Sequence, residues 1–176
     1  MKNLKTSKLV YLSLLISLAL VLSLIERTMP LPFTTPGAKL GLSNLVIILA
    51  VYTLDNYHEA FLVLILKIFL SGLLGGNLSS LMYSFSGGVL SFLITLLVKN
   101  TFKEYVSIIG VSASAAVFHN IGQLLVASLI LDNLSIFLYL PMLTIIGIIT
   151  GIFIGLSANY ILNHFKKLNL SNLNQT

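Results

Sequence analysis

Long apolar runs separated by short polar breaks form the main pattern along this chain. The runs cover about residues 9–27, 40–54, 58–75, 78–98, 105–131 and 134–162. About 20 apolar residues cross the roughly 30 Å hydrocarbon core of a bilayer as a helix. A spanning backbone must also satisfy its own hydrogen bonds, and these runs are too continuous for alternating barrel strands. The pattern therefore predicts one all-α integral membrane domain over residues 1–176, with six transmembrane helices.

The composition agrees with a membrane protein. Hydrophobic residues make up 57% of the chain and charged residues only 9%, whereas charged residues are about a quarter of a typical soluble domain. Cysteine is absent, so disulfides and thiolate metal or redox sites are excluded.

The basic residues predict the orientation of the six spans. Of the ten lysines and arginines, seven fall on the side that holds both termini: Lys2, Lys5, Lys8, Lys99, Lys103, Lys166 and Lys167. Arg27 and Lys39 fall on the other side, and Lys67 lies inside a span. By the positive-inside rule we expect both termini in the cytosol of a multi-pass protein of a prokaryotic plasma membrane. Because most of these lysines lie next to the membrane lipid, the net charge of +5 needs no nucleic acid as a partner.

A proline-rich segment (residues 26–44) joins the first two spans. It holds three of the four prolines of the chain: Pro30, Pro32 and Pro36. Proline removes a backbone donor and disfavours helix in the residue before it, so the segment is a stiff connector. It also carries three charged residues: Glu26, Arg27 and Lys39. Two interpretations stay open, a wall or lid of a binding site and a tight extracellular turn.

Polar residues inside the predicted spans indicate a binding site. His119 and Gln123 share one face of the fifth span, and Asn120 lies at its shoulder. Ionisable groups are costly in hydrocarbon, so His119 and Lys67 need partners or a wet cavity. We interpret the face as part of a ligand site; the alternative is an interhelical hydrogen-bond cluster without a ligand. Lys67 is either a ligand contact or half of an internal ion pair.

Three further features concern the helix surfaces. Tyr83, near the outer end of the fourth span, is a candidate ligand contact, although an interfacial anchor is the simpler interpretation. Small residues repeat every four positions in the last span (Gly147, Gly151 and Gly155) and form a ridge for close helix packing. Ser13 and Ser17 give one such pair in the first span, where a partner protein is an equally good explanation.

The sequence contains no recognisable catalytic machinery. It has no phosphate-binding Walker loop, so we expect no ATP hydrolysis by this chain. Its two aspartates, Asp55 and Asp132, fall in loops on opposite sides, whereas Mg²⁺ chemistry on diphosphates needs clustered carboxylates. We therefore expect no enzyme activity, no metal and no cofactor.

Several motifs resemble the Gx transporter family, which is also labelled heptaprenyl diphosphate synthase component I. The resemblance covers nearly the whole chain and is carried by Pro30-Leu31-Pro32-Phe33, Pro36-Gly37-x-Lys39-Leu40-Gly41-Leu42-Ser43-Asn44, Phe118-His119-Asn120-Ile121-Gly122-Gln123-Leu124 and Gly147-x-x-x-Gly151.

That family is similar to the substrate-binding (S) components of energy-coupling factor (ECF) importers. The resemblance implies a six-helix bundle that captures a small vitamin-like molecule from outside and works with a transmembrane coupling subunit and two cytosolic ATPases. It implies an outward-facing site that includes Arg27, Lys39 and Asn44 together with His119, Asn120 and Gln123. It also implies docking of the coupling subunit on the first helix, where Ser13 and Ser17 stand in place of alanines.

Two other functions remain open at this point. The family label suggests a membrane accessory subunit of a prenyl diphosphate synthase, and a solitary facilitator would need no ATPase. The label and the cations Arg27, Lys39 and Lys67 together suggest an anionic, partly hydrophobic cargo such as an isoprenoid or quinone precursor.

Overall fold

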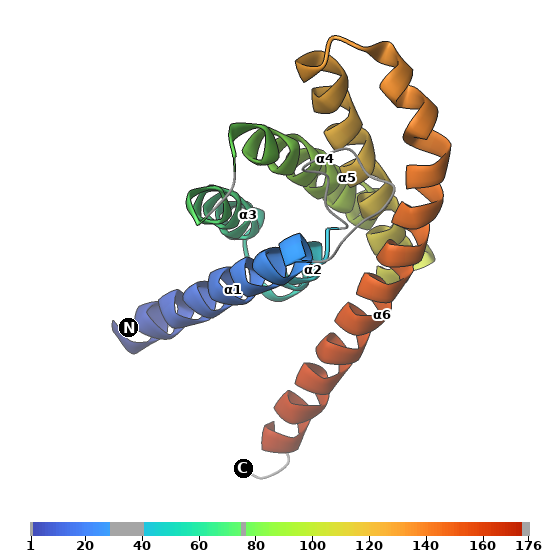
Figure 1. The fold of residues 1–176 in the computed structure, drawn as a ribbon. Helices are drawn as coiled ribbons and strands as arrows, with labels where there is room; N and C mark the ends of the chain where they lie inside the picture. The colour runs from blue at the N-terminus through green and yellow to red at the C-terminus, as the bar shows by residue number, and fades with distance from the viewer. Residues whose placement is uncertain (1, 29–40, 75–76, 174–176) are drawn as a thin grey trace.

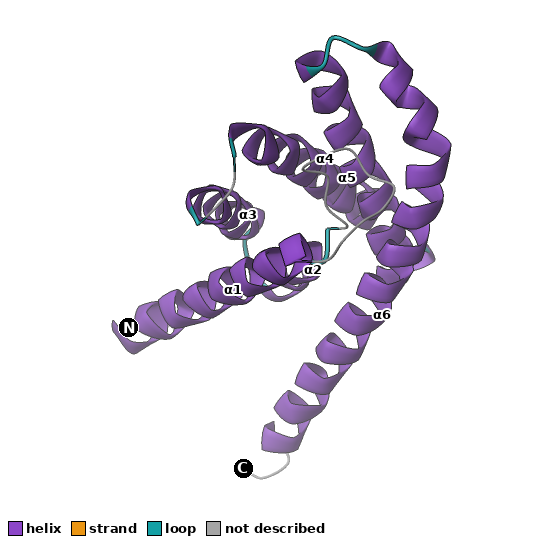
Figure 2. Cartoon of the chain, in the orientation of Figure 1, coloured by secondary structure: helices purple, strands orange, loops and turns teal. Residues whose placement is uncertain are grey.

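The computed structural model describes residues 2–28, 41–74 and 77–173, and these residues form an all-helical structure (Figure 2). The elements are α1 (Lys2–Thr28), α2 (Asn44–Thr53), α3 (Tyr57–Leu73), α4 (Leu78–Phe102), the 3₁₀ helix η1 (Lys103–Tyr105), α5 (Ile108–Ile130), the 3₁₀ helix η2 (Leu134–Tyr139) and α6 (Leu140–Leu173). The predicted all-α class is therefore confirmed for the described part of the chain.

The helices form two groups, which meet where α2 packs on α6 and where α3 packs on α4 (Figure 1). The most extensive contacts join α5 to α4 on one side and to α6 on the other, while α1, α2 and α3 pack together beside them. One buried apolar cluster is shared by α1–α4, a second joins α2 to α6, and a third lies between α4, α5, η2 and α6. The start of α1 and the end of α6 both lie in the lower half of Figure 1.

Within the described part of the chain, four helical segments are long and apolar enough to cross a membrane: Thr6–Thr28, Leu78–Tyr105, Ile108–Ile130 and Leu134–Lys167. The chain is thus a membrane protein by the length and composition of its helices. α2 has 10 residues and α3 has 17. At about 1.5 Å per residue α2 reaches only about 15 Å, half of a hydrocarbon core. The count of six spans, and the side of the membrane on which the termini lie, stay predictions.

The observed helix boundaries differ from the predicted spans for identifiable reasons. α5 begins at Ile108 rather than near residue 105, because the Ser107 side chain accepts a hydrogen bond from the Gly110 backbone amide at 3.3 Å and caps the helix. The sixth run opens with η2, and α6 begins only at Leu140. Pro141 follows as its second residue, where the missing N–H costs nothing.

The glycine ridge of α6 packs directly against α5, as predicted. A Cβ built at Gly151 would lie 2.5 Å from Ala113 Cα, and one at Gly155 would lie 2.6 Å from Ile109 Cα. These distances are far below normal van der Waals contact, so the two backbones approach closely only because the side chains are missing.

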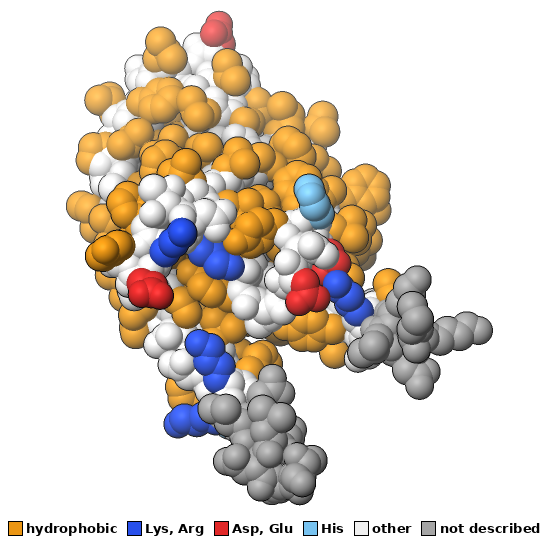
Figure 3. Space-filling view, turned by 180° about the vertical axis from the view of Figure 1, so that it is seen from behind, with side chains coloured by type: hydrophobic (Ala, Val, Ile, Leu, Met, Phe, Trp, Pro, Cys, Tyr) orange, Lys and Arg blue, Asp and Glu red, His pale blue; other side chains and the backbone are white. Residues whose placement is uncertain are grey.

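Most charged side chains on the face in Figure 3 gather in its lower half, whereas the upper half is mainly hydrophobic with one acidic side chain at the top. Lys8 of α1 bridges to Glu59 Oε1 at 2.8 Å and to Asp55 Oδ2 at 3.5 Å. The ends of α2 and α4 and the starts of α3 and α5 lie at the same end of the bundle as this group. We call it the basic end, because it also carries Lys99 and Lys103.

Candidate functional site

Four polar side chains from α1, α2 and α5 are buried close together in the described structure. They are Glu26, Asn44, His119 and Gln123, with exposed fractions of 2%, 5%, 3% and 5%. We call them the polar cluster. His119 lies eleven residues after the start of α5 at Ile108, which places it about 16 Å from the basic end.

His119 and Gln123 form the centre of the polar cluster. Gln123 lies one helical turn after His119, and its Nε2 atom is 3.0 Å from His119 Nε2. The amide nitrogen donates in this contact, and His119 Nε2 accepts. Gly87 of α4 packs on both side chains, because a Cβ built there would lie 3.0 Å from His119 Cε1 and 3.0 Å from Gln123 Cγ.

Gly41 connects the polar cluster to α1. Its backbone amide and that of Leu42 both donate to Glu26 Oε1, the second at 3.3 Å. Gly41 adopts φ +83°, a conformation that other residues avoid. A Cβ built on it would lie 2.9 Å from Asn44 Nδ2 and 3.5 Å from His119 Cδ2. The carboxylate of α1 thus fixes the turn that packs against Asn44 and His119.

Two nitrogen donors near the polar cluster have no hydrogen-bond partner among the described residues: Asn44 Nδ2 and Arg27 Nε. Another nitrogen of the Arg27 guanidinium bonds to α3, because Nη2 donates to the Ser71 carbonyl and, at 2.9 Å, to Ser71 Oγ. Ser23 of α1 lies 2.9 Å from the same hydroxyl. Arg27 therefore connects α1 to α3, and its Nε–H remains as a buried donor for another group.

Asn120 and Tyr83 lie apart from the polar cluster. Asn120 Nδ2 donates to the Leu143 carbonyl at 2.8 Å and so faces α6. Tyr83 is 4% exposed and packs among apolar residues of the third cluster, including Leu124 and Ile136. Its interpretation as an interfacial anchor is therefore wrong, because an anchor must reach the membrane surface. The structure brings only His119 and Gln123 of the predicted three-residue face together.

The other candidate residues have mixed outcomes. Lys67 is 4% exposed and lies one turn before Ser71 on α3, and its role as a ligand contact stays a prediction. Lys39 and residues 29–40 of the proline-rich segment lie outside the described residues. Ser13 and Ser17 are exposed on α1, and the Ser13 hydroxyl donates to the Leu9 carbonyl at 2.9 Å.

Sequence reasoning did not assign Glu26, Gly41, Ser71 or Gly87 to the site. Glu26 had a usable signal, since a carboxylate at the end of a membrane-length apolar run is costly unless it is bonded. Gly41 entered only as part of the family motif, and Gly87 had no signal, because its contacts with His119 and Gln123 come from an element far away in the sequence.

Among the described residues, no group of three or more His, Cys, Asp or Glu side chains is placed to hold a metal ion. What the polar cluster offers is hydrogen-bond donors and acceptors from one imidazole, two amides and a carboxylate, in an apolar surrounding. This arrangement is suited to recognition of a small polar group.

Comparison with known proteins identifies the family. A search of curated proteins found no match, and a search of solved structures also found none. The model of one protein family matches residues 15–161, which is most of the chain and includes the whole polar cluster. The chain belongs to the family described as heptaprenyl diphosphate synthase component I.

Proposed function

We propose that this chain is the substrate-binding subunit of an importer of the ECF type, a multi-pass plasma-membrane protein with both termini in the cytosol. In this function it captures a small molecule from outside, while a transmembrane coupling subunit and two ATPases on other chains supply the energy. The chain itself catalyses no reaction. The observation that carries the proposal is the polar cluster, buried about 16 Å from the basic end.

The energetics of a membrane protein favour a functional role for the polar cluster. A charged group at the centre of a transmembrane helix costs about 2.5–3.5 kcal/mol on insertion scales, so such groups are rare and serve binding or transport. Here a carboxylate, an imidazole and two amides are buried together. Asn44 Nδ2 and Arg27 Nε have no partner among the described residues and are suited to an acceptor on a ligand. We infer a cargo with an anionic or carbonyl group and an apolar body, as in a vitamin-like molecule or an isoprenoid or quinone precursor.

The outer surface of α1 supports docking of a coupling subunit. Ser13 and Ser17 are exposed one turn apart, and Leu14 and Leu18 beside them are 62% and 46% exposed. Small residues flanked by leucines allow another helix to approach the backbone of α1 closely. We therefore propose that the coupling subunit packs on this face, and we expect Ser13→Leu to weaken its association without affecting cargo capture.

The test of cargo capture is mass spectrometry of small molecules that co-purify with the protein. We expect His119→Ala and Gln123→Ala to lose the bound compound while their helical circular dichroism and unfolding temperature stay close to wild type. Ser114→Ala is the matched control, because its hydroxyl bonds only to the Gly110 carbonyl of the same helix, at 3.0 Å. Normal retention of the compound by both site variants would show that the polar cluster is structural.

A second function is favoured by the family description alone. In it, the chain is a membrane accessory subunit that supports a soluble prenyl diphosphate synthase. The two functions separate in a pull-down from native membranes followed by assay. Co-purification with a coupling subunit and ATPases supports import, whereas restored chain elongation by a soluble partner supports the synthase.

A further inference from the structure

We propose that a hollow at the basic end of the bundle binds a phosphate group, separately from the cargo site. The hollow has a volume of about 500 Å³ and lies where the end of α2, the end of α4, the start of α5 and the middle of α6 meet. Its lining includes Lys99, Lys103, Ser107 and Asn159. Among the described residues that line it there are two lysines and no carboxylate.

Lys99 is held in place as a fixed cation. Its Nζ donates to the Val51 carbonyl at 2.7 Å, and this carbonyl lies at the end of α2, where the helix dipole favours a positive charge. The same Nζ lies 4.4 Å from the ring centroid of Tyr52 and 5.1 Å from that of Tyr57. An ammonium has three N–H donors, so donors remain for an anion in the hollow after the bond to Val51.

Lys103 brings the second cation to the same hollow through an unusual turn. It adopts φ 42° directly after α4, a left-handed conformation that non-glycine residues seldom take. This turn ends α4 and leads into η1, with Lys103 in the lining together with Lys99. Glu104 follows it and lines a neighbouring hollow with Lys103 and Tyr105, but it is not part of the lining of the hollow at Lys99.

Neutral donors complete the site. Ser107 and Ile108 of the lining belong to the start of α5. The Gly110 amide there is capped by Ser107 Oγ, and the amides before it lack partners within the helix and favour an anion. Asn100 Oδ1 accepts the hydroxyl of Tyr57 at 2.9 Å, which leaves its amide nitrogen as a donor. Two ammonium groups, amide nitrogens and a helix start together match the several acceptor oxygens of a phosphate.

Exposed aromatic residues beside the hollow match a position at the membrane–water interface, where lipid phosphates are found. Tyrosines are enriched at the membrane–water interface, and Tyr105 beside the hollow is 95% exposed while Phe102 is 47% exposed. The basic end is the side that we predict to face the cytosol, where anionic lipids attract lysines. A lipid headgroup and a soluble phosphate compound share the recognised group, and both can reach this position.

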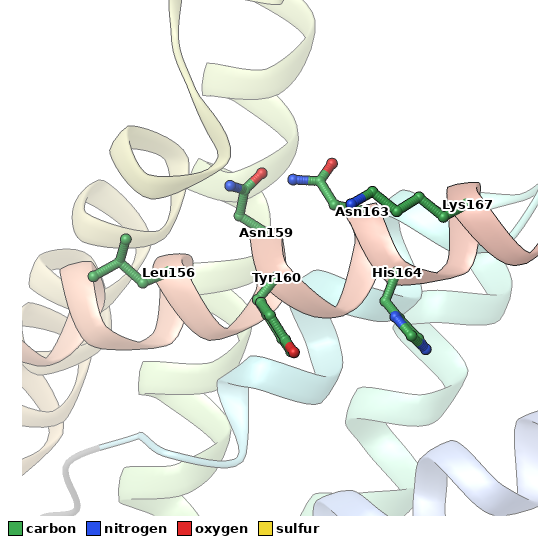
Figure 4. Close-up of a pocket in the computed structure, with 6 residues that line it drawn as sticks. All are labelled: Leu156, Asn159, Tyr160, Asn163, His164 and Lys167. Atoms are coloured by element: carbon green, nitrogen blue, oxygen red, sulfur yellow. The ribbon is translucent and has the colours of Figure 1, made fainter.

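A second hollow runs along α6 and meets the first at Asn159. Figure 4 shows that its lining comes from α6 alone, with Asn159 and Asn163 on one side of the helix and Tyr160 and His164 on the other. The side chain of Lys167 runs back toward Asn163. Because these side chains do not converge, we assign the phosphate to the hollow at Lys99 and Lys103.

The test uses the full chain in detergent with equal amounts of phosphatidylglycerol and phosphatidylcholine, followed by native mass spectrometry. We expect wild type to retain phosphatidylglycerol in preference, and Lys103→Gln to lower its retention at least threefold. The double variant Lys99→Gln/Lys103→Gln should remove the preference. Lys166→Gln is the matched control, because it removes one charge from an exposed position of α6 outside the hollow.

A second arm separates the two sources of the phosphate. Inorganic diphosphate is titrated into wild type and Lys103→Gln. If a lower diphosphate concentration displaces phosphatidylglycerol from wild type than from the variant, the hollow binds a soluble phosphate compound. Retention that depends on the lysines and resists diphosphate assigns it to a lipid headgroup. Lys99→Gln also removes the bond to the Val51 carbonyl and could unfold the protein. In that case the retention of phosphatidylglycerol by Lys103→Gln alone decides the test. Equal retention by Lys103→Gln and Lys166→Gln would overturn the proposal.

Discussion

Replacing Gly151 with alanine tests whether the contact between α5 and α6 holds the bundle together. The added Cβ would lie 2.5 Å from Ala113 Cα and 2.8 Å from the Ser112 carbonyl oxygen. Carbon atoms pack best at about 3.5–4.0 Å, so α6 would have to move away by about 1 Å. Both neighbours are backbone atoms, and no side-chain rotation relieves the contact.

The expected loss of stability follows from two opposing effects. Overpacking of a well-packed interior costs about 1–3 kcal/mol, and a backbone contact belongs at the upper end of that range. Alanine in place of glycine in a helix returns about 1 kcal/mol. The net destabilisation is therefore about 2 kcal/mol. At about 2–4 °C per kcal/mol for a chain of this size, the unfolding temperature should fall by about 4–8 °C.

The assay is thermal unfolding of the purified protein in detergent, followed by circular dichroism, with Gly110→Ala as the control. A Cβ at Gly110 would lie 2.7 Å from Val106 Cγ1, a similar distance, but that methyl group can rotate away. Gly110→Ala should therefore unfold at the wild-type temperature or slightly above it. An unfolding temperature of Gly151→Ala at or above that of wild type would refute the reasoning, as would equal shifts of both variants.

Two further substitutions test the bonds around the candidate site. Glu26→Ala leaves the amides of Gly41 and Leu42 without their acceptor. An unsatisfied buried donor costs about 1–3 kcal/mol, so the unfolding temperature measured by circular dichroism should fall. An unfolding temperature equal to that of wild type would mean that water replaces the carboxylate. Asn120→Ala removes the bond to the Leu143 carbonyl and should lower the free energy of unfolding by about 1 kcal/mol. The variant should still retain the co-purifying compound. Loss of that compound at normal stability would instead place Asn120 in the cargo site.

The candidate site was only partly predictable from the sequence. The one-turn spacing of His119 and Gln123 placed them together correctly, because residues four apart share a helix face. Asn120, next to His119 in sequence, points about 100° away around the helix and bonds to α6 instead. Tyr83 was assigned by its position near a helix end, but its burial depends on α5 and η2 packing over it. Gly41 entered only through the family motif and Gly87 gave no signal, since both matter through the His119 ring that they contact.

The sequence by itself determined that this is an all-helical membrane protein, approximately where its apolar helices lie and that a glycine ridge joins the last helix to a neighbour. These properties follow from composition and from periods of a few residues, which act locally along the chain. Only the tertiary structure decided that Glu26 bonds the turn at Gly41, that Arg27 is committed to Ser71, and that Lys99 and Lys103 share one hollow with Asn159. Those relations join residues from different helices, and the positions of helices relative to one another depend on packing that no local pattern records.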